Sequence, residues 1–165
     1  MPVTYENIAT TTLSSSGTDI TFSSIGSGFT DLRLVINLTP TASSFVRVQF
    51  NGDTANNYSL TRLHGNGTTA TSNRNSSISG ISFIASSTYS TTIPTFLTAD
   101  VFSYAGSTNK TVLATLSGDY NGSGEVSRIV GLWRNTAAIT SLRLYLLSGD
   151  FAAGTTATLY GILRA

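Results

Sequence analysis

Apolar and polar residues alternate with a period of two along much of this chain, and this alternation is the feature that most limits its fold. Residues 32–38 alternate Leu, Leu, Ile and Leu with mainly polar residues, and residues 46–50 do the same with Val, Val and Phe. Successive side chains of a strand point to opposite faces, so both runs predict strands with one buried face. Turn residues recur every 8 to 15 positions, and no apolar stripe of helical spacing persists for three turns. The sequence therefore predicts an all-β fold with minimal helix.

A sequence echo near the C-terminus predicts two β-hairpins. Leu116-Ser-Gly-Asp119-Tyr120 leads to Gly131-Leu-Trp-Arg134, and Leu147-Ser-Gly-Asp150-Phe151 leads to Gly161-Ile-Leu-Arg164. Each copy joins a strand, a Gly-Asp turn with an aromatic residue after it, a polar loop and a return strand, which is typical of a hairpin. We expect about ten strands in one domain over residues 1–165. The expected architecture is an antiparallel two-sheet sandwich, with a jelly-roll-like order preferred to an immunoglobulin-like one.

The remaining strands are expected from shorter runs of β-branched and aromatic residues. The stretch from Gly65 to Ser77 is rich in Asn, Ser, Thr and Gly, so we expect it to be a long exposed loop. The further strands are predicted within residues 1–13, 20–22, 58–64, 78–84, 95–104 and 111–116.

Composition excludes several classes of protein. Ser and Thr number 24 and 27, while charged residues make up 10%, against about 25% in an ordinary soluble domain. The nine Lys and Arg residues are scattered and the net charge is +1, so no basic stripe predicts nucleic-acid binding. The N-terminus lacks the pattern of a secretory signal, and no apolar run is long enough for a membrane span. There is no cysteine, so stability is expected to rest on packing alone.

Candidate catalytic residues are few, and we expect no enzymatic activity. His64 is the only histidine, and a Ser-His-Asp triad would need it with Asp53 or Asp100. No nucleophile-elbow motif supports such a triad, so His64 is expected to be a solvated residue at a loop edge. Asp119 and Glu125 flank one loop and could form a glycosidase pair. A simpler reading makes Asp119 a turn residue whose side chain binds its own backbone.

Two binding motifs involve the same loop. Residues 119–124 match the first six positions of an EF-hand calcium loop, but position twelve is Val130 where a bidentate Glu is required. No metal or cofactor is therefore expected. Trp133, the only tryptophan, could form a sugar-stacking platform with Tyr120 and Tyr145. A place in the core is the simpler expectation for Trp133, because the matching residue of the second echo is Leu163.

Four blocks of the sequence resemble a family of small virion proteins of tailed phages, common in cyanophages and marine siphophages and podophages. The blocks are short, and their order and spacing carry the resemblance. One departure is Gly26, where the family often has Pro. The blocks are Ile20-Thr-Phe-Ser-Ser-Ile25, Val48-Gln-Phe-Asn-Gly-Asp53 with Asn57-Tyr-Ser59, Gly131-Leu-Trp-Arg134, and Leu159-Tyr-Gly-Ile162.

The resemblance implies a structural protein of the virion, made in the host cytoplasm and exposed on the particle surface. Members decorate capsids or form distal domains of tail fibres. Because the first predicted strand begins almost at Met1, we expect a capsid decoration or cement protein, a homotrimer bound to the major capsid protein. The expected contacts are Tyr5, Ile8, Arg134 and Arg164, with the segment Met1 to Thr12 gripping the shell.

Two alternatives remain open at this stage. The first is a receptor-binding module of a tail fibre or head fibre, which would recognise a host glycan through Asp119, Tyr120 and Trp133. The second is a depolymerase using Asp119 and Glu125. One further expectation follows from the single Lys, two Glu and three Pro. Such residues commonly protect sheet edges from other strands, so we expect some edges to be covered by copies of the chain or by a larger assembly.

Overall fold

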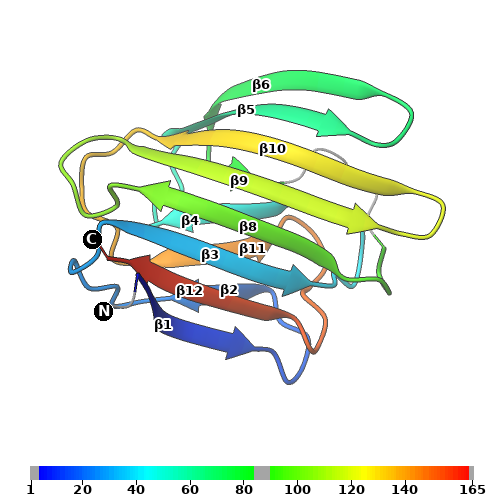
Figure 1. The fold of residues 1–165 in the computed structure, drawn as a ribbon, viewed down its shortest axis with the longest axis horizontal. Coiled ribbons are helices and arrows are strands. Elements are labelled where there is room, and N and C mark those ends of the chain that lie inside the picture. Colours follow the sequence, from blue (N-terminus) through cyan, green and yellow to red (C-terminus); the bar gives the residue numbers. More distant parts are fainter. Residues whose placement is uncertain (1–3, 84–89, 164–165) are drawn as a thin grey trace.

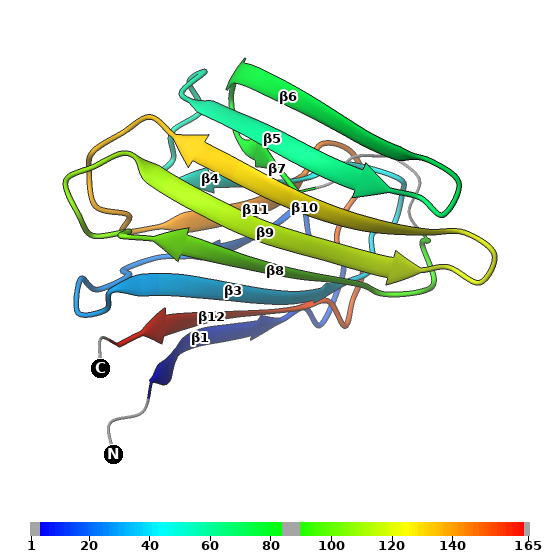
Figure 2. The same cartoon turned by 45° about the horizontal axis from the view of Figure 1, so that its top comes forward.

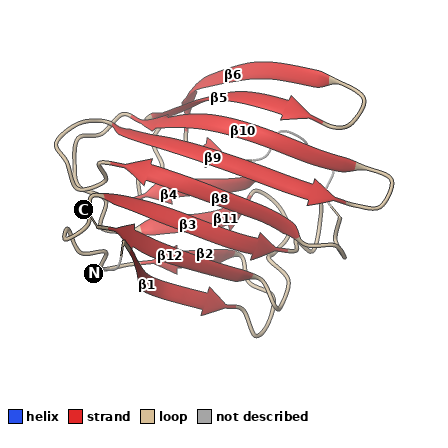
Figure 3. Ribbon diagram, viewed as in Figure 1, coloured by secondary structure: helices blue, strands red, loops and turns tan. Residues whose placement is uncertain are grey.

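The computed structural model describes residues 4–83 and 90–163, and every regular element in these ranges is a β-strand. None of the described residues forms a helix, so none forms a helix that could cross a lipid bilayer. Figure 3 shows strands and loops throughout. The strands are β1 (Tyr5–Thr12), β2 (Asp19–Phe22), β3 (Asp31–Leu38), β4 (Val46–Phe50), β5 (Tyr58–Gly65), β6 (Ala70–Ile78), β7 (Ile81–Ser82), β8 (Thr95–Phe102), β9 (Lys110–Asp119), β10 (Gly124–Trp133), β11 (Leu142–Leu146) and β12 (Thr156–Ile162).

The strands form two antiparallel sheets that pack face to face (Figure 1). The wide sheet has eight strands in the order β1-β12-β3-β8-β9-β10-β5-β6. The narrow sheet has four strands in the order β2-β11-β4-β7 and lies behind the wide one in the view of Figure 1. The predicted class, an all-β two-sheet sandwich, is therefore confirmed.

The period-two alternation fills the space between the sheets. In β3 the apolar residues at 32, 34, 36 and 38 are at most 1% exposed, and in β4 those at 46, 48 and 50 are equally buried. Burying one such side chain contributes about 1.5–3 kcal/mol. A slip of one residue in the pairing would turn this whole set to the solvent. The alternation thus fixes the register of both strands as well as their existence.

The strand order differs from the expected jelly-roll order, which is not confirmed. Strands β8, β9 and β10 are consecutive in the chain and adjacent in the wide sheet, as in a meander. The sheets contain eight and four strands, and the described residues hold twelve strands where about ten were expected. Spacing along the chain cannot reveal strand order, because it does not say which sheet a strand joins.

The first of the two predicted hairpins is confirmed, and the prediction of the second is wrong. β9 and β10 pair along their whole length, from Lys110 with Trp133 to Asp119 with Gly124. β11, by contrast, lies in the narrow sheet and β12 in the wide one. Between them, Phe151 is fully buried and bridges to Gly17 and Pro40. The second Leu-Ser-Gly-Asp segment therefore crosses between the sheets, with its aromatic residue closing the core.

The predicted long loop from Gly65 to Ser77 is also wrong, because most of it is the edge strand β6. Ala70 pairs with Gly65 and the pairing continues along β5 to Ile78. Main-chain hydrogen bonds to β5 hold this strand, so it needs no apolar side chains, and its exposure is as expected. The strand predicted for Ile78–Ile84 is reduced to β7, Ile81–Ser82, and Ile84 lies outside the described residues.

The first and last strands, β1 and β12, lie side by side in the wide sheet (Figure 2). β1 is an edge of the wide sheet and pairs with β12, while β2 is an edge of the narrow sheet and pairs with β11. The first two strands of the protein therefore take their strand partners from the last two.

Candidate functional site

Two hairpin tips enclose a groove on the wide sheet. The β5–β6 tip and the β9–β10 tip lie next to each other, at the right of the view in Figure 1. The groove between them has a volume of about 550 Å³, and an adjoining pocket of about 320 Å³ shares part of its lining. Asn66 shapes the first tip, since its side-chain oxygen accepts the backbone N–H groups of Thr68 and Thr69 at 3.1 and 2.8 Å.

Asp119 and Glu125 line this groove but do not form a catalytic pair. Asp119 is exposed, and its Oδ1 accepts the backbone N–H of Asn121 at 3.0 Å, which confirms its expected role in the turn. Asn121 and Gly122 complete that turn at φ values of 58° and 113°. Glu125 is 6% exposed and belongs to the inward-facing row of β10. The two carboxylates therefore face opposite sides of the wide sheet.

Glu125 instead belongs to a buried polar cluster with His64 and Ser127. Ser127 Oγ donates to Glu125 Oε1 at 2.8 Å, and His64 Nδ1 lies 3.3 Å from each of these two oxygens. The side chain of His64 is 12% exposed, so the expectation that His64 is solvated is wrong. A catalytic triad needs serine and acid on different ring nitrogens. Here one nitrogen faces both, and Ser127 is 1% exposed, so the cluster is structural.

The two aspartates considered as partners for His64 lie elsewhere. Asp100 Oδ1 pairs with Arg33 Nη1 at 3.3 Å on the outer face of the wide sheet. Asp53 follows β4, near the end of β5 that is opposite to His64. Among the described residues, no group of three or more His, Asp or Glu is placed to hold a metal ion. The alternation could have pointed to the buried cluster, because Glu125 and Ser127 share the inward phase of β10 with Ile129.

The alternative reading, a glycan platform of Asp119, Tyr120 and Trp133, finds these three side chains apart. Trp133 pairs with Lys110 and Asp119 with Gly124, at opposite ends of one hairpin. Nine residues of strand separate these ends by about 30 Å. Trp133 is 0% exposed, which confirms its expected place in the core. Tyr120 packs partly against the core with its hydroxyl 2.9 Å from Thr95 Oγ1, and burial raises its pKa.

Trp133 and Asp53 form the centre of a second hydrogen-bonded cluster. The carboxylate of Asp53 accepts hydrogen bonds from Trp133 Nε1 at 2.7 Å, Asn57 Nδ2 at 3.0 Å and the backbone N–H of Ala55 at 2.9 Å. Burial would raise the pKa of Asp53, but these hydrogen bonds outweigh it and hold that pKa below the usual value. The indole also stacks on Tyr58, with ring centroids 6.2 Å apart. These residues fasten the loop after β4 to the end of β10.

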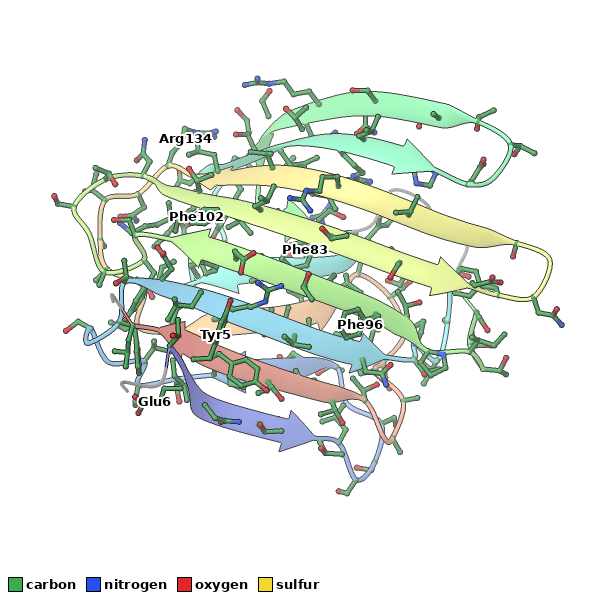
Figure 4. The ribbon with its side chains drawn as sticks, viewed as in Figure 1. Tyr5, Glu6, Phe83, Phe96, Phe102 and Arg134 are labelled. Carbon is green, nitrogen blue, oxygen red and sulfur yellow. The ribbon has the colours of Figure 1, made fainter. Side chains whose placement is uncertain are left out.

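The outer face of the wide sheet carries most of the exposed large apolar side chains. Six of the seven found among the described residues lie in its outward-facing rows, and the seventh, Leu147, follows β11. Leu63 and Val126 border a shallow depression of about 260 Å³. Figure 4 shows Tyr5, Phe96 and Phe102 on the side of the sheet that faces the viewer. The six residues are Tyr5, Leu63, Phe96, Phe102, Val126 and Val130, with exposed fractions from 40 to 60%.

The four expected capsid contacts are placed differently from one another. Tyr5 is 46% exposed at the β1 edge and packs edge-on against Tyr160 at 6.4 Å. Ile8 is partly buried against the core, and its role as a contact stays a prediction. Arg134 is exposed, follows β10, and donates from Nη2 to the carbonyl of Asn56 at 2.7 Å. Arg164 lies outside the described residues.

The fold defines the class of protein: an antiparallel two-sheet β-sandwich, with six large apolar side chains exposed on the outer face of its wide sheet. Comparison of the chain with protein-family models, with curated proteins and with solved structures finds no match.

Proposed function

We propose that this chain is a structural protein of a tailed-phage particle, a capsid decoration protein that binds the assembled shell and stabilises it. The observation that carries the proposal is the apolar outer face of the wide sheet. Contiguous apolar surface on a folded protein commonly marks a contact with another protein. Interface cores are also depleted in charge and enriched in aromatic residues. Six large apolar side chains are exposed on the outer face, and three of them, Tyr5, Phe96 and Phe102, are aromatic.

One end of this face brings Tyr5, Ile162 and Phe102 into one row across neighbouring strands. Tyr5 pairs with Ile162, which pairs with Asp31, and the neighbouring strand ends at Phe102. Tyr160 packs against Tyr5 in the next row. We propose this end, on the exposed edge strand β1, as the part of the face that contacts the major capsid protein. Tyr5 remains the proposed anchor, and the partly buried Ile8 lies on the same strand.

The protein would stabilise the shell by binding to it, without catalysing a reaction. A protein that binds the assembled shell but not its dissociated subunits stabilises the shell by its binding free energy, repeated over many sites. A contact made of apolar and hydroxyl groups loses little affinity when salt screens charges. Only the Arg33–Asp100 ion pair is found on this face among the described residues. Shell occupancy should therefore persist at high salt.

The first test is the copy number of the chain in purified virions, measured by quantitative mass spectrometry against the major capsid protein. A decoration protein is expected at a ratio between one to one and one to a few. A ratio below about one to fifty would reject decoration and place the chain at a tail or head fibre. Size-exclusion chromatography with light scattering would test the proposed homotrimer in the same preparation.

The second test uses shells that lack the protein and measures how much added protein they retain. The double variant Tyr5→Asp, Phe102→Asp places two charges on the proposed contact and is expected to lose most of its occupancy. Leu147→Asp is the matched control, because Leu147 is 48% exposed but lies off this face. Equal retention of both variants would refute the proposed contact.

A further inference from the structure

Asparagine followed by glycine occurs three times in this chain, and each time between strands. The three pairs are Asn51-Gly52, Asn66-Gly67 and Asn121-Gly122. The first pair follows β4, and the other two lie at the tips of the β5–β6 and β9–β10 hairpins, at the right of the view in Figure 1. All three asparagines and their glycines are exposed. Neither the dipeptide nor its exposure therefore distinguishes the three sites.

In an Asn-Gly pair the asparagine side chain can react with the backbone that follows it. The glycine nitrogen attacks Cγ of the asparagine and a C–N bond forms, while the amide nitrogen leaves as ammonia with the proton of the glycine N–H. One water molecule then opens the cyclic succinimide to aspartate or isoaspartate, so the reaction needs no reagent besides solvent. Glycine favours the attack, because it has no Cβ and its backbone adopts conformations that other residues avoid.

The side chain of Asn51 is held against this reaction at both ends of its amide. Its Oδ1 accepts the backbone N–H groups of Thr140 and Ser141 at 2.8 and 3.1 Å. Its Nδ2 donates to the backbone carbonyl of Ala138 at 2.7 Å. The amide has to turn before the nitrogen of Gly52 can approach Cγ. In Asn51 that movement breaks three hydrogen bonds.

The side chain of Asn66 is held through its oxygen alone, but by several groups. Oδ1 accepts the backbone N–H groups of Thr68 and Thr69, as described above, and their hydroxyl groups donate to the same oxygen at 2.9 and 3.2 Å. These contacts fix the orientation of the amide within the β5–β6 tip. Asn66 is therefore also protected, although it is exposed to solvent.

Asn121 differs from both, because the fold does not hold its side chain. Its backbone N–H donates to Asp119 Oδ1 at 3.0 Å, but its side-chain amide has no hydrogen-bond partner among the described residues. The space beside Gly122 is open, since an added Cβ would meet no atom within 4 Å. The amide of Asn121 can therefore turn toward the glycine nitrogen without breaking a hydrogen bond.

We propose that Asn121 is the deamidation site of the folded protein and that the fold protects Asn51 and Asn66. The reaction replaces a neutral amide by a carboxylate, so the formal net charge of the chain falls from +1 to 0. The new charge lies two residues from Asp119, at the rim of the groove between the hairpin tips. Isoaspartate also adds one methylene group to the main chain of the turn, which changes the shape of that rim.

The site does not depend on the proposed capsid contact. Phe102 pairs with Thr111, which pairs with Leu132, so the proposed contact lies at the end of the wide sheet opposite to the β9–β10 tip. A protein that failed to bind capsids would still deamidate at Asn121. A capsid-bound protein would keep this tip away from the shell contact.

The test is incubation of the full chain in mildly alkaline buffer, followed by tryptic digestion and mass spectrometry. Cleavage after Arg47, Arg62, Arg74, Lys110 and Arg128 places the three pairs on three separate peptides. Electron-transfer fragmentation then distinguishes isoaspartate from aspartate. In the folded protein the rate constant at Asn121 is expected to exceed the other two by at least about tenfold, because each protected amide has to give up two or more hydrogen bonds.

The same incubation in urea removes these hydrogen bonds, so the three rates should become similar. Equal rates in the folded protein would show that the hydrogen bonds do not protect, and would refute the proposal. It would also be overturned if Asn51 or Asn66 reacted fastest, or if Asn121 reacted only in urea.

Two variants assign the change of charge to one residue. Ion-exchange chromatography of the incubated wild type should resolve a growing acidic form. Asn121→Gly keeps a residue that tolerates the φ of 58° and removes the amide, so its acidic form should be lost. Asn66→Gly at the neighbouring tip is the matched control and should form the acidic species as the wild type does. An acidic form that persisted in Asn121→Gly would reject this site.

Discussion

Replacing Asp53 by Ala should destabilise the fold far more than its position in a loop suggests. Asp53 lies after β4, in the turn closed by Asn51 and Gly52, but its carboxylate holds the indole of Trp133 in the core. The substitution leaves the loop its length and removes three acceptor contacts at once. Its effect therefore measures how much the loop contributes to holding the end of β10 in place.

The magnitude can be worked from the three hydrogen bonds. Trp133 is 0% exposed, so its N–H would lose its partner without gaining water, at a cost of about 1–3 kcal/mol. The bonds from Asn57 and from Ala55 lie nearer the solvent, which would replace part of their contribution. The sum is about 3 kcal/mol. For a chain of this size, that lowers the melting temperature by roughly 6–12 °C.

The assay is urea unfolding followed by tryptophan fluorescence, which reports a single site because Trp133 is the only tryptophan. Asp119→Ala is the matched control, since Asp119 accepts one backbone N–H two residues later, as Asp53 does. This control should lose about 0.5–1 kcal/mol, the value of an exposed turn hydrogen bond. If Asp53→Ala were no less stable than Asp119→Ala, the indole contact would contribute nothing and the reasoning would fail.

Three further outcomes are expected. The pKa of Asp53 in the folded protein lies below its ordinary value of 3.8. The stabilising effect of the ionised carboxylate is therefore present above pH 3.8 and is lost as the pH falls through the folded-state pKa. The difference in unfolding free energy between the wild type and Asp53→Asn should shrink in that range. Gly161→Ala should cost about 1–3 kcal/mol in urea unfolding because its Cβ would overlap the ring of Phe29, while Gly26→Ala, with open space around it, should be neutral. Lys110→Met should cost about 2 kcal/mol or more in the same assay, because the fully buried Nζ donates to three backbone carbonyls that would lose their donor.

The sequence predicts those parts of the fold in which side chains alone decide the structure. Strands β3 and β4 follow from alternation, since each buries one face. β6 does not, because its residues Ala70–Ser77 are all exposed and its main chain pairs with β5 through groups common to every residue. The two Leu-Ser-Gly-Asp segments show the same limit. Their residues are alike, but the first continues β9 to Asp119, whereas in the second Gly149 takes a φ of 67° and Phe151 is buried where the chain changes sheets.

The functional surfaces were predictable only in part. Asp119 as a turn former and Trp133 as a core residue follow from residue chemistry and position. The groove between the two hairpin tips could not be found this way, since it depends on which strands become neighbours in the wide sheet.

The pairing of the first two strands with the last two has a consequence during synthesis. When β1 and β2 leave the ribosome, the strands they need are not yet translated, and Tyr5 must wait for Ile162. Contacts this distant in sequence make folding slow, and unpaired strands invite association with other chains. We therefore expect β1 and β2 to stay unpaired until β11 and β12 have been translated, and a chain stopped before β11 to aggregate. Both sheets can close only when these two later strands are present.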